Sequence, residues 1–368
     1  MKRNLQQHMG LLMVIALWLC LTLWAWLKPA DAVSVSERRS LAQMPQLSSQ
    51  SLLSGNFMED FASYAVDQFP LRDGFRQIKA LAANYGFGQR DNNGIYLAGG
   101  SAVAMEYPLD SDSVDYALER FNELYDLYLN ESSNILFAIV PDKGYYLGKS
   151  SAHLTMDYEA LFSAMQTGLS WARFVDITDC LTGDSYYRTD THWRQEHLLP
   201  VAEKLARALD IPAPEPDQFD RQVLTQDFRG VYHGQAALPM EPDTLLYLTW
   251  QGWEDCTVYT HDTAQTTQIY DMGKRASNDL YDIFLSGGAA VQTIQNPNAA
   301  TDRELIVFRD SFGSSLIPLL AQEYSTVTLI DTRYISPKLL EDYVNFQDKE
   351  ILMLYSTLLL NSSGSLRK

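Results

Sequence analysis

With 368 residues, 46% of them hydrophobic, the chain has enough apolar material for one large α/β domain or two smaller ones, and global disorder is excluded. Its formal net charge of −18 argues against a nucleic-acid-binding protein, because neutralising phosphates needs a basic surface. The same charge disfavours broad adhesion to anionic membranes or polyanions.

The first segment with a clear pattern is an uncharged apolar run from Met9 to Leu27, preceded by Lys2 and Arg3. At about 1.5 Å per helical residue, this run can span a hydrocarbon core of roughly 30 Å. The basic residues before it favour a cytoplasmic N-terminus, with the main body exported. Cleavage as a signal peptide is the alternative, because residues 30–32 (Ala-Asp-Ala) fit the small-residue pattern. We favour an uncleaved anchor, because the run is long and holds three Trp.

Between the anchor and the main domain we expect a tether and a small extension. Residues 29–56 are rich in Ser, Gln and Ala without a clear period. A helical pattern follows and is interrupted at Pro70. Residues 92–107 are typical of a β-hairpin with its turn at Asn93-Gly94. The predicted segments are an N-terminus and anchor (1–28), a tether (29–56), a helical and hairpin extension (57–109) and a main domain (110–368).

Helix-like and strand-like segments alternate in the main domain. An amphipathic helix is predicted from Val114 to Tyr128, capped by Asp112 or Ser113. The elements expected after it are a buried strand ending at Pro141, helix 158–169, strand 173–181, a helix through Leu205 and Leu209, strand 305–308, helix 314–324, strand 327–330, helix 337–344 and strand 351–355. This alternation is typical of a three-layer parallel α/β fold.

The stretch from about residue 210 to residue 300 is less regular. It contains short β-like pieces at 245–250, 256–261 and 281–288. We interpret it as an insertion into the main domain rather than as a second independent domain.

Ser311 lies just past the end of one predicted strand and before a predicted helix. In doubly wound sheets, ligands bind at the carboxyl ends of the strands. A serine there exposes its hydroxyl beside unpaired backbone N–H groups, as nucleophilic serines do in many α/β hydrolases. An ordinary helix N-cap is the alternative interpretation. The segment does not match G-x-S-x-G, so an ordinary α/β-hydrolase elbow is not expected.

A nucleophilic serine needs a base, and the chain has six histidines. In "RTDTHW", Asp190 precedes His192 by two residues. Its carboxylate can therefore reach the Nδ1–H of the imidazole and leave Nε2 facing outward as a base. Asp190, His192 and Ser311 can together fill the three roles of a catalytic triad. A capping Asp beside a surface His is the alternative for the first two.

Metal chemistry is the weaker interpretation of the same segment. "DTHWRQEH" groups Asp190, His192, Glu196 and His197. It contains neither H-E-x-x-H nor the Cys–His spacing of a zinc site. We therefore expect no metal and no cofactor.

Three cysteines are too few for a disulfide framework. Cys20 lies in the anchor. Cys180 and Cys256 either pair in an oxidising compartment or remain separate thiols.

"TDTHW" together with "FRDSFGSSLIPLLAQEY…LIDTRY" resembles the DHHW protein family. That family is similar to the alginate O-acetyltransferases of the AlgX/AlgJ type, which have SGNH-hydrolase-like domains. The stretches "SERRSLAQMP", "FASYAVDQFPLRDGFRQIKA" and "YDIFLSGGAAVQTIQN" agree, so the resemblance covers most of the exported chain. In one departure, Thr191 stands where the family name implies a first His, which is not a triad position.

The resemblance implies that Ser311 is the catalytic serine, His192 the base and Asp190 its orienting acid. The backbone N–H of Ser311 is the first candidate oxyanion donor, and Gly288 and Gly234 are further candidates whose other interpretation is turn glycines. The implied fold is a three-layer, SGNH-hydrolase-like parallel α/β sheet with an irregular β-containing insertion, preceded by an N-terminal transmembrane helix.

The implied function is that of an exported, membrane-anchored serine O-acetyltransferase that acts on a cell-envelope or secreted polysaccharide through an acetyl-serine intermediate. A membrane-bound O-acyltransferase is the implied acetyl donor, because an extracellular enzyme has no evident acetyl-CoA supply. A carbohydrate esterase with the same triad is one alternative. A non-catalytic carbohydrate-binding or assembly protein is another, since aromatic segments such as "LYLTWQGW" can stack on sugars, although we favour packing in the core and the insertion for them.

Overall fold

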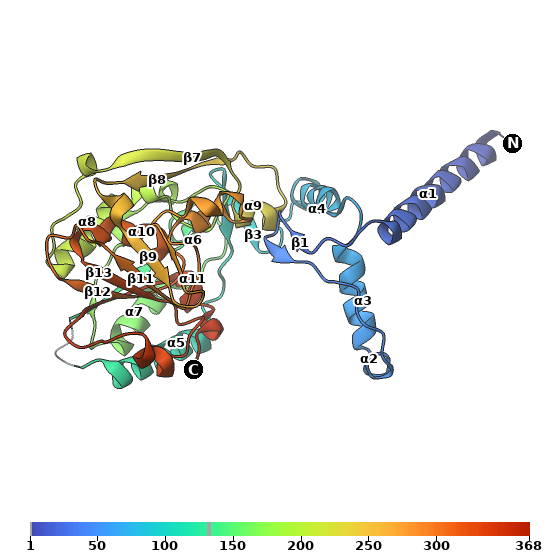
Figure 1. The fold of residues 1–368 in the computed structure, drawn as a ribbon. Helices are drawn as coiled ribbons and strands as arrows, with labels where there is room; N and C mark the ends of the chain where they lie inside the picture. Colours follow the sequence, from blue (N-terminus) through green and yellow to red (C-terminus); the bar gives the residue numbers. More distant parts are fainter. Residues whose placement is uncertain (1, 131–133) are drawn as a thin grey trace. The chain divides into compact units, whose positions relative to one another are not determined.

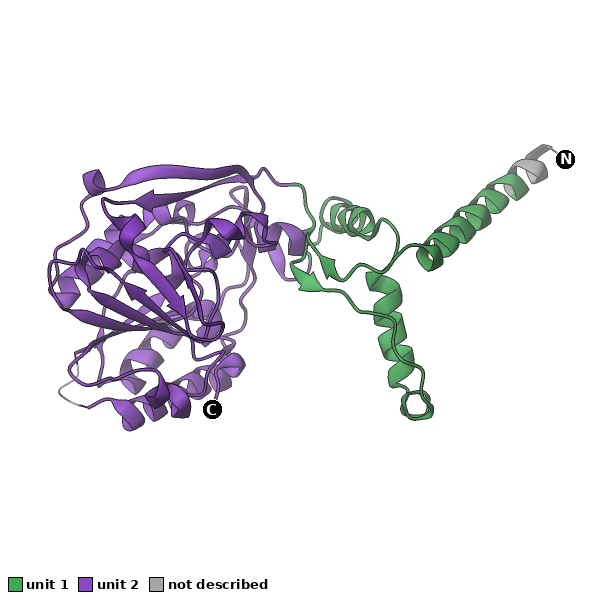
Figure 2. Ribbon diagram, viewed as in Figure 1, with its two compact units in different colours: residues 1–92, 237–239 green, residues 93–236, 240–368 purple. Residues whose placement is uncertain are grey.

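The computed structural model describes residues 2–130 and 134–368. Met1, where the predicted anchor segment begins, lies outside the described residues. The chain divides into two compact units: residues 1–92 with 237–239, and residues 93–236 with 240–368 (Figure 2). The segment boundaries expected from the sequence stay a prediction, and each unit is described by itself.

The first unit is mainly helical. Its elements are α1 (Lys2–Leu27), β1 (Val33–Ser34), β2 (Arg39–Ser40), α2 (Ser49–Ser54), α3 (Asn56–Asp67), α4 (Arg72–Leu81) and the π-helical turn η1 (Ala82–Gly86). Within α1, His8–Leu27 has a mean hydropathy of 2.2 and is long and apolar enough to cross a membrane. Pro70 separates α3 from α4, as the sequence predicts, because proline has no N–H to continue the helix.

The second unit is built on an eight-stranded sheet with the order β10-β9-β11-β13-β12-β14-β5-β6. These strands are β5 (Ile135–Val140), β6 (Arg173–Phe174), β9 (Thr257–Thr260), β10 (Gln265–Thr267), β11 (Val291–Gln295), β12 (Glu304–Arg309), β13 (Thr326–Ile330) and β14 (Glu350–Ser356). The five strands from β13 to β6 run parallel, whereas β9, β10 and β11 pair antiparallel at the other side. Two hairpins lie outside this sheet: β3 (Ile95–Ala98) with β4 (Ser101–Ala104), and β7 (Asp220–Phe228) with β8 (Asp243–Thr249).

Helices cover both faces of the sheet (Figure 1). The helices of this unit are α5 (Ser111–Tyr128), α6 (Lys143–Leu147), α7 (Tyr158–Gly168), α8 (Leu199–Leu209), α9 (Val231–Ala236), α10 (Gly313–Leu320) and α11 (Thr357–Leu360). Along β5, Leu136 and Ala138 pack in the cluster that contains α8 and α10, and Ile135 and Phe137 in the cluster that contains α5 and α7. Because side chains alternate across a strand, β5 is buried on both faces. The three-layer α/β architecture that the sequence predicts is thereby confirmed.

The stretch 281–288, expected to be β-like, is not a strand. It contains most of the 3-10 helix η8 (Leu280–Ile283). Leu285, Ser286 and Gly287 then have φ values of 56°, 59° and 88°. Three successive residues with positive φ cannot form a strand.

Two local details also differ from expectation. The β3–β4 hairpin turns at Gly99-Gly100, both with positive φ, and not at Asn93-Gly94. Helix α5 is capped by Asp110, whose side chain accepts from the Ser113 backbone N–H, and not by Asp112 or Ser113.

Two predicted elements are shorter or tighter than expected. Of the strand predicted at 173–181, only Arg173–Phe174 pairs, and it forms the edge of the parallel part of the sheet beside β5. The helix predicted at 337–344 is a 3-10 helix, η10 (Pro337–Asp342). A segment this short gains little from α-helical hydrogen bonds, since most helical stability comes from packing of an amphipathic face.

Candidate active site

The candidate active site lies where parallel strands of the sheet end. At the carboxyl end of β12 the chain turns through Asp310 and Ser311 into α10. One oxygen of the Asp310 carboxylate accepts from the Phe312 backbone N–H at 3.0 Å, and the other from the Ser356 backbone N–H at 2.8 Å. Ser356 ends β14, so this buried carboxylate fixes the Ser311 turn to the neighbouring strand.

Arg309 supports the same turn from within the core. Its guanidinium donates to Ser314 Oγ and to Gln292 Oε1, each at 2.8 Å. Burial lowers the pKa of Arg309 from its ordinary value, because the charged form is removed from water. A Cβ at Gly313 would come within 2.9 Å of the Arg309 Cβ, so glycine permits the close passage of the turn over this side chain.

The structure brings the three predicted triad residues together. His192 Nδ1 lies 2.6 Å from Asp190 Oδ1, and His192 Nε2 lies 2.9 Å from Ser311 Oγ. A carboxylate only accepts hydrogen bonds, so Nδ1 carries the proton and Nε2 of the neutral ring accepts from the Ser311 hydroxyl. Asp190 is fully buried and His192 is 8% exposed, while Ser311 is only partly buried. Their catalytic roles stay a prediction at this point.

The second oxygen of Asp190 is also occupied. It accepts from the Val231 backbone N–H at 2.8 Å, at the start of α9. A Cβ at Gly230 would lie 2.2 Å from the Asp190 Cβ, so only glycine lets this backbone approach the carboxylate so closely. Asp190 therefore keeps its orientation toward His192 without relying on solvent.

Trp193 ties the histidine-bearing loop to the serine-bearing turn. Its buried indole N–H donates to the Phe312 carbonyl and to Ser315 Oγ, each at 3.0 Å. Tyr281 stacks on the His192 ring at a centroid distance of 3.9 Å and an interplanar angle of 8°. The Tyr281 hydroxyl lies 2.7 Å from Ser315 Oγ. The imidazole is thus held in its plane by an aromatic face that also favours a positive charge on the ring.

Two buried charges hold the loop that precedes His192. Asp243, at the start of β8, accepts from the backbone N–H groups of Arg188 and Thr189 at 3.0 and 2.9 Å. Lys143, just past the end of β5, donates to the carbonyls of Tyr187 and Arg188 at 2.8 and 3.4 Å. The loop is therefore fixed by two elements that are distant in sequence.

The Lys143 ammonium is buried and also lies 5.0 Å from the centre of the Tyr232 ring. The Tyr232 hydroxyl donates to Thr191 Oγ1 at 3.0 Å, so the lysine also supports Thr191 through this ring. Burial lowers the pKa of Lys143 to about 7, although the carboxylates of Asp190, Asp243 and Asp142 act to raise it.

The candidate oxyanion donors are placed as follows. Within residues 2–130 and 134–368, the Ser311 backbone N–H has no hydrogen-bond acceptor, as expected of a group that can meet a substrate oxygen. Gly234 lies within α9, and Gly288 lies close to the Tyr334 hydroxyl. The role of these glycines stays a prediction.

The described residues offer neither a metal site nor a disulfide. These residues contain no group of three His, Cys, Asp or Glu side chains placed to hold a metal ion. Cys20, Cys180 and Cys256 are free thiols, so the pairing of the last two is not formed. Burial raises the pKa of Cys180 and of Cys256 to about 11, which makes both poor thiolates.

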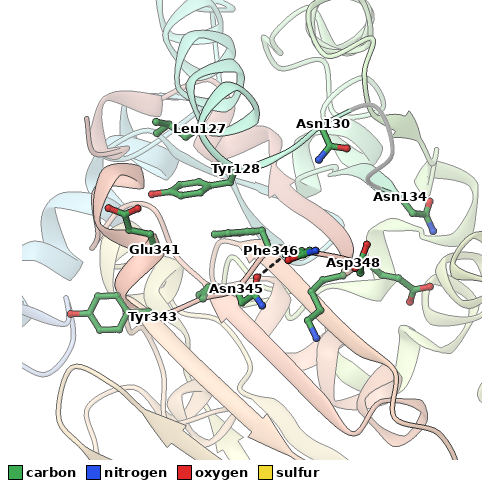
Figure 3. A pocket seen from close by; sticks show the side chains of 13 residues that line it. Leu127, Tyr128, Asn130, Asn134, Glu341, Tyr343, Asn345, Phe346 and Asp348 are labelled. Atoms are coloured by element: carbon green, nitrogen blue, oxygen red, sulfur yellow. Dashed lines mark hydrogen bonds between the residues drawn. The ribbon is translucent and has the colours of Figure 1, made fainter.

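A cavity of about 1150 Å³ lies at the amino ends of the strands, whereas Ser311 follows the carboxyl end of β12. Figure 3 shows the side chains that line this cavity. It is lined by Asn134 and Glu350, next to the amino ends of β5 and β14, and by the stacked rings of Tyr128 and Phe346. Because the triad lies at the carboxyl ends of the strands, this cavity is not part of the candidate active site.

Comparison with known proteins adds a family and a fold. The sequence pattern of the family described as DHHW protein matches residues 164–330, which confirms the predicted resemblance and includes both triad segments. No curated protein matches this sequence.

Among solved structures, a DHHW family protein from Eubacterium siraeum is 20% identical, with a TM-score of 0.58 over 76% of this chain and 97% of that chain. PatB1 from Bacillus cereus, in a structure with a sulfonyl adduct, is 16% identical, with a TM-score of 0.58 over 72% of this chain and 95% of that chain. The O-acetyltransferase domain of AlgJ from Pseudomonas putida is 14% identical, with a TM-score of 0.44 over 73% of this chain and 92% of that chain. At these identities, the two structures at 0.58 establish similarity of fold.

Sequence reasoning did not find the residues that hold the triad in place. Lys143 follows β5, and Asp243 is the first residue of β8. The sequence does not indicate that either strand lies beside the His192 loop. Tyr281 falls in a piece of the insertion that the sequence predicts to be β-like. A polar residue just past a buried apolar run, such as Lys143 after "NILFAIVPD", was the one available signal.

Replacing Trp193 by Phe tests whether its indole N–H positions His192. If His192 serves as a base for Ser311, Trp193→Phe should lower kcat for an activated aryl acetate by about 10- to 100-fold with KM unchanged, because a small displacement of the base is costly. Trp171→Phe is the matched control, since it also removes an indole hydrogen bond, to Asn122 on α5, but away from the site. Equal kcat values in the two variants would contradict the positioning role.

Replacing Lys143 by Met tests the buried charge through the pH dependence of stability. Because the pKa of Lys143 is about 7 in the folded chain and near 10.5 when unfolded, the unfolded chain binds more protons between these values. The contribution of Lys143 to stability is therefore fully present above its pKa in the unfolded chain. It is lost as the pH falls through its pKa in the folded chain.

The free energy of unfolding of the wild type minus that of Lys143→Met should therefore grow between pH 7 and about pH 9.5. Denaturant unfolding of the detergent-solubilised chain at several pH values measures it. Lys338→Met, at a side chain 63% exposed, should follow the wild-type profile. Parallel profiles for the wild type and Lys143→Met would show that Lys143 does not titrate in this range.

Proposed function

We propose that this protein is a serine O-acetyltransferase that acts on a cell-envelope or secreted polysaccharide. The observation that carries the proposal is the continuous hydrogen-bonded chain from Asp190 through His192 to Ser311, with distances of 2.6 and 2.9 Å. A protein that only binds carbohydrate has no need for this arrangement. The DHHW sequence pattern over both segments of the triad supports the same proposal.

The first half-reaction transfers an acetyl group to the protein. His192 Nε2 accepts the Ser311 hydroxyl proton as Ser311 Oγ attacks the acetyl carbonyl carbon. Asp190 stabilises the imidazolium that forms, and the Ser311 backbone N–H stabilises the oxyanion. The imidazolium then returns the proton to the departing group, which leaves acetyl-Ser311.

The second half-reaction consumes the acetyl-serine. His192 takes a proton from a sugar hydroxyl, whose oxygen attacks the acetyl carbon. The ester bond to Ser311 Oγ breaks, and the proton passes from His192 to Ser311. If water replaces the sugar hydroxyl, the same steps release acetate, and the protein acts as an esterase. The partial exposure of Ser311 is compatible with both acceptors.

The apolar segment of α1 supports a location at the cell membrane, with the second unit outside. A membrane-bound O-acyltransferase that passes acetyl groups outward is the proposed donor, because such a partner and an anchored acceptor enzyme meet at the same surface. No cofactor takes part in the proposed reaction.

Ser311→Ala and His192→Ala test the proposal. With an activated aryl acetate, each variant should release aryl alcohol at least about 10³-fold more slowly than the wild type, because the nucleophile or its base is lost. The Ser311 side chain is partly exposed, and among the described residues its one hydrogen-bond partner is His192, so Ser311→Ala should change the free energy of unfolding by less than about 1 kcal/mol.

Ser314→Ala provides the reverse control in the same turn. It removes one of the two side-chain acceptors of the buried Arg309 guanidinium, so it should lower stability by about 1–3 kcal/mol and retain turnover. If Ser311→Ala were destabilised and still active, Ser311 would be a helix cap rather than a nucleophile.

A further inference from the structure

A second concave surface lies at one end of the β7–β8 hairpin. It is a groove of about 900 Å³ between the start of β7, the end of β8 and the turn that follows. Its aromatic lining is Tyr247, Trp250 and Trp253, which belong to the "LYLTWQGW" segment. The triad makes no use of this segment, so the clustering of its rings in a groove needs another explanation.

The aromatic rings of the groove are fixed from beneath. Tyr270 is fully buried and lies 4.7 Å from the Tyr247 ring and 5.4 Å from the Trp253 ring, measured between centroids. Its hydroxyl donates to the Leu248 carbonyl, so this support is itself held. Tyr247 and Trp253 remain only partly buried. Rigid, partly exposed rings give contact area at little cost in conformational entropy.

The polar lining of the groove has one sign of charge. Three carboxylates, Asp217, Asp220 and Glu254, line it together with four glutamine side chains. The lining residues include no Lys and no Arg. Carboxylates and amide oxygens accept hydrogen bonds from hydroxyl and ammonium groups, and the glutamine amides can also donate. A ligand that carries carboxylates along its length would be repelled here, and one with hydroxyl or amine groups would be favoured.

The groove lies at the end of α10 that is opposite to Ser311. Gln322, which lines it, follows α10, whereas Ser311 precedes the same helix. Helix α10 has eight residues (Gly313–Leu320), so at about 1.5 Å per residue it separates the two by roughly 12 Å along its length. A polysaccharide can cover this distance with several sugar units.

We propose that this groove binds a neutral or amine-bearing polysaccharide, several sugar units away from the unit that is acetylated. Trp253 and Tyr247 contact the faces of the sugar rings, and the carboxylates bind hydroxyl or ammonium groups. The proposal rests on the proposed transferase function for the use of this binding, and it names the class of acceptor. Polyuronates such as alginate are excluded as acceptors by the charge of the groove.

Calorimetric titration of the full chain in detergent micelles tests the proposal with three hexasaccharides: partly N-deacetylated chitin, fully N-acetylated chitin and alginate. We expect the amine-bearing hexamer to bind tightest, the neutral one more weakly, and alginate not at all. Trp253→Ala should weaken binding of both chitin hexamers by about tenfold or more. Tyr259→Ala removes a ring that is 38% exposed and lies outside the groove, so it should bind like the wild type.

A second variant separates charge from packing. Asp220 and Glu254 are exposed, so Asp220→Asn with Glu254→Gln should fold normally. This variant should lose the preference for the amine-bearing hexamer and keep the affinity for the neutral one. The proposal is overturned if the wild type binds neither chitin hexamer, if it prefers alginate, or if both groove variants bind like the wild type.

Binding is measured without turnover, so the two proposals fail separately. If the chain binds the hexamers specifically but Ser311 is never acetylated, the transferase proposal is wrong and the groove proposal stands. If Ser311 is acetylated but the chain binds none of the hexamers, the groove proposal is wrong and the transferase proposal stands.

Discussion

The Trp193 indole N–H donates a bifurcated hydrogen bond to the Phe312 carbonyl and Ser315 Oγ. These acceptors lie 119 and 122 residues further along the chain, so the bond joins two distant segments. His192 precedes this indole by one residue, and Ser311 precedes Phe312 by one residue. The bond therefore sets the separation of base and nucleophile almost directly. Phe312 also packs edge-on against the Trp193 ring, at 5.4 Å and 87°, so the contact combines hydrogen bonding with packing. The Trp in the Asp-Thr-His-Trp motif thus has a physical reason that is separate from the chemistry.

The loop before His192 is held by polar groups that must be buried. Lys143 is buried with carbonyl partners, and its depressed pKa reflects the loss of hydration. Asp243 is buried as well and is satisfied by backbone N–H groups. Buried polar groups of this kind contribute little net stability, but they specify one arrangement of the backbone. A network that fixes a loop beside a partly exposed serine is consistent with preorganisation for a reaction.

Much of the fold followed from the sequence because the parallel strands are buried on both faces. Segments such as Ile135–Val140 therefore stand out as apolar runs, and the strand after which Ser311 comes was found in this way. Asp190, His192 and Ser311 could be proposed from the sequence because a short Asp-x-His spacing and a strand-to-helix turn are local signals; the structure brings them together, and their catalytic roles stay a prediction. The contribution of Lys143 depends on which strands are neighbours in the sheet, and that of Tyr281 on a 3-10 helix (η8) that packs against the His192 ring. Local sequence patterns encode neither property.

The most direct test of the account is mass spectrometry of the full chain quenched shortly after mixing with an activated aryl acetate. The account predicts an acetyl increment on the peptide that contains Ser311, its absence in His192→Ala, and its loss when an acceptor polysaccharide is added. A well-folded chain with no acetyl group on Ser311, or with the same increment in His192→Ala, would contradict the triad.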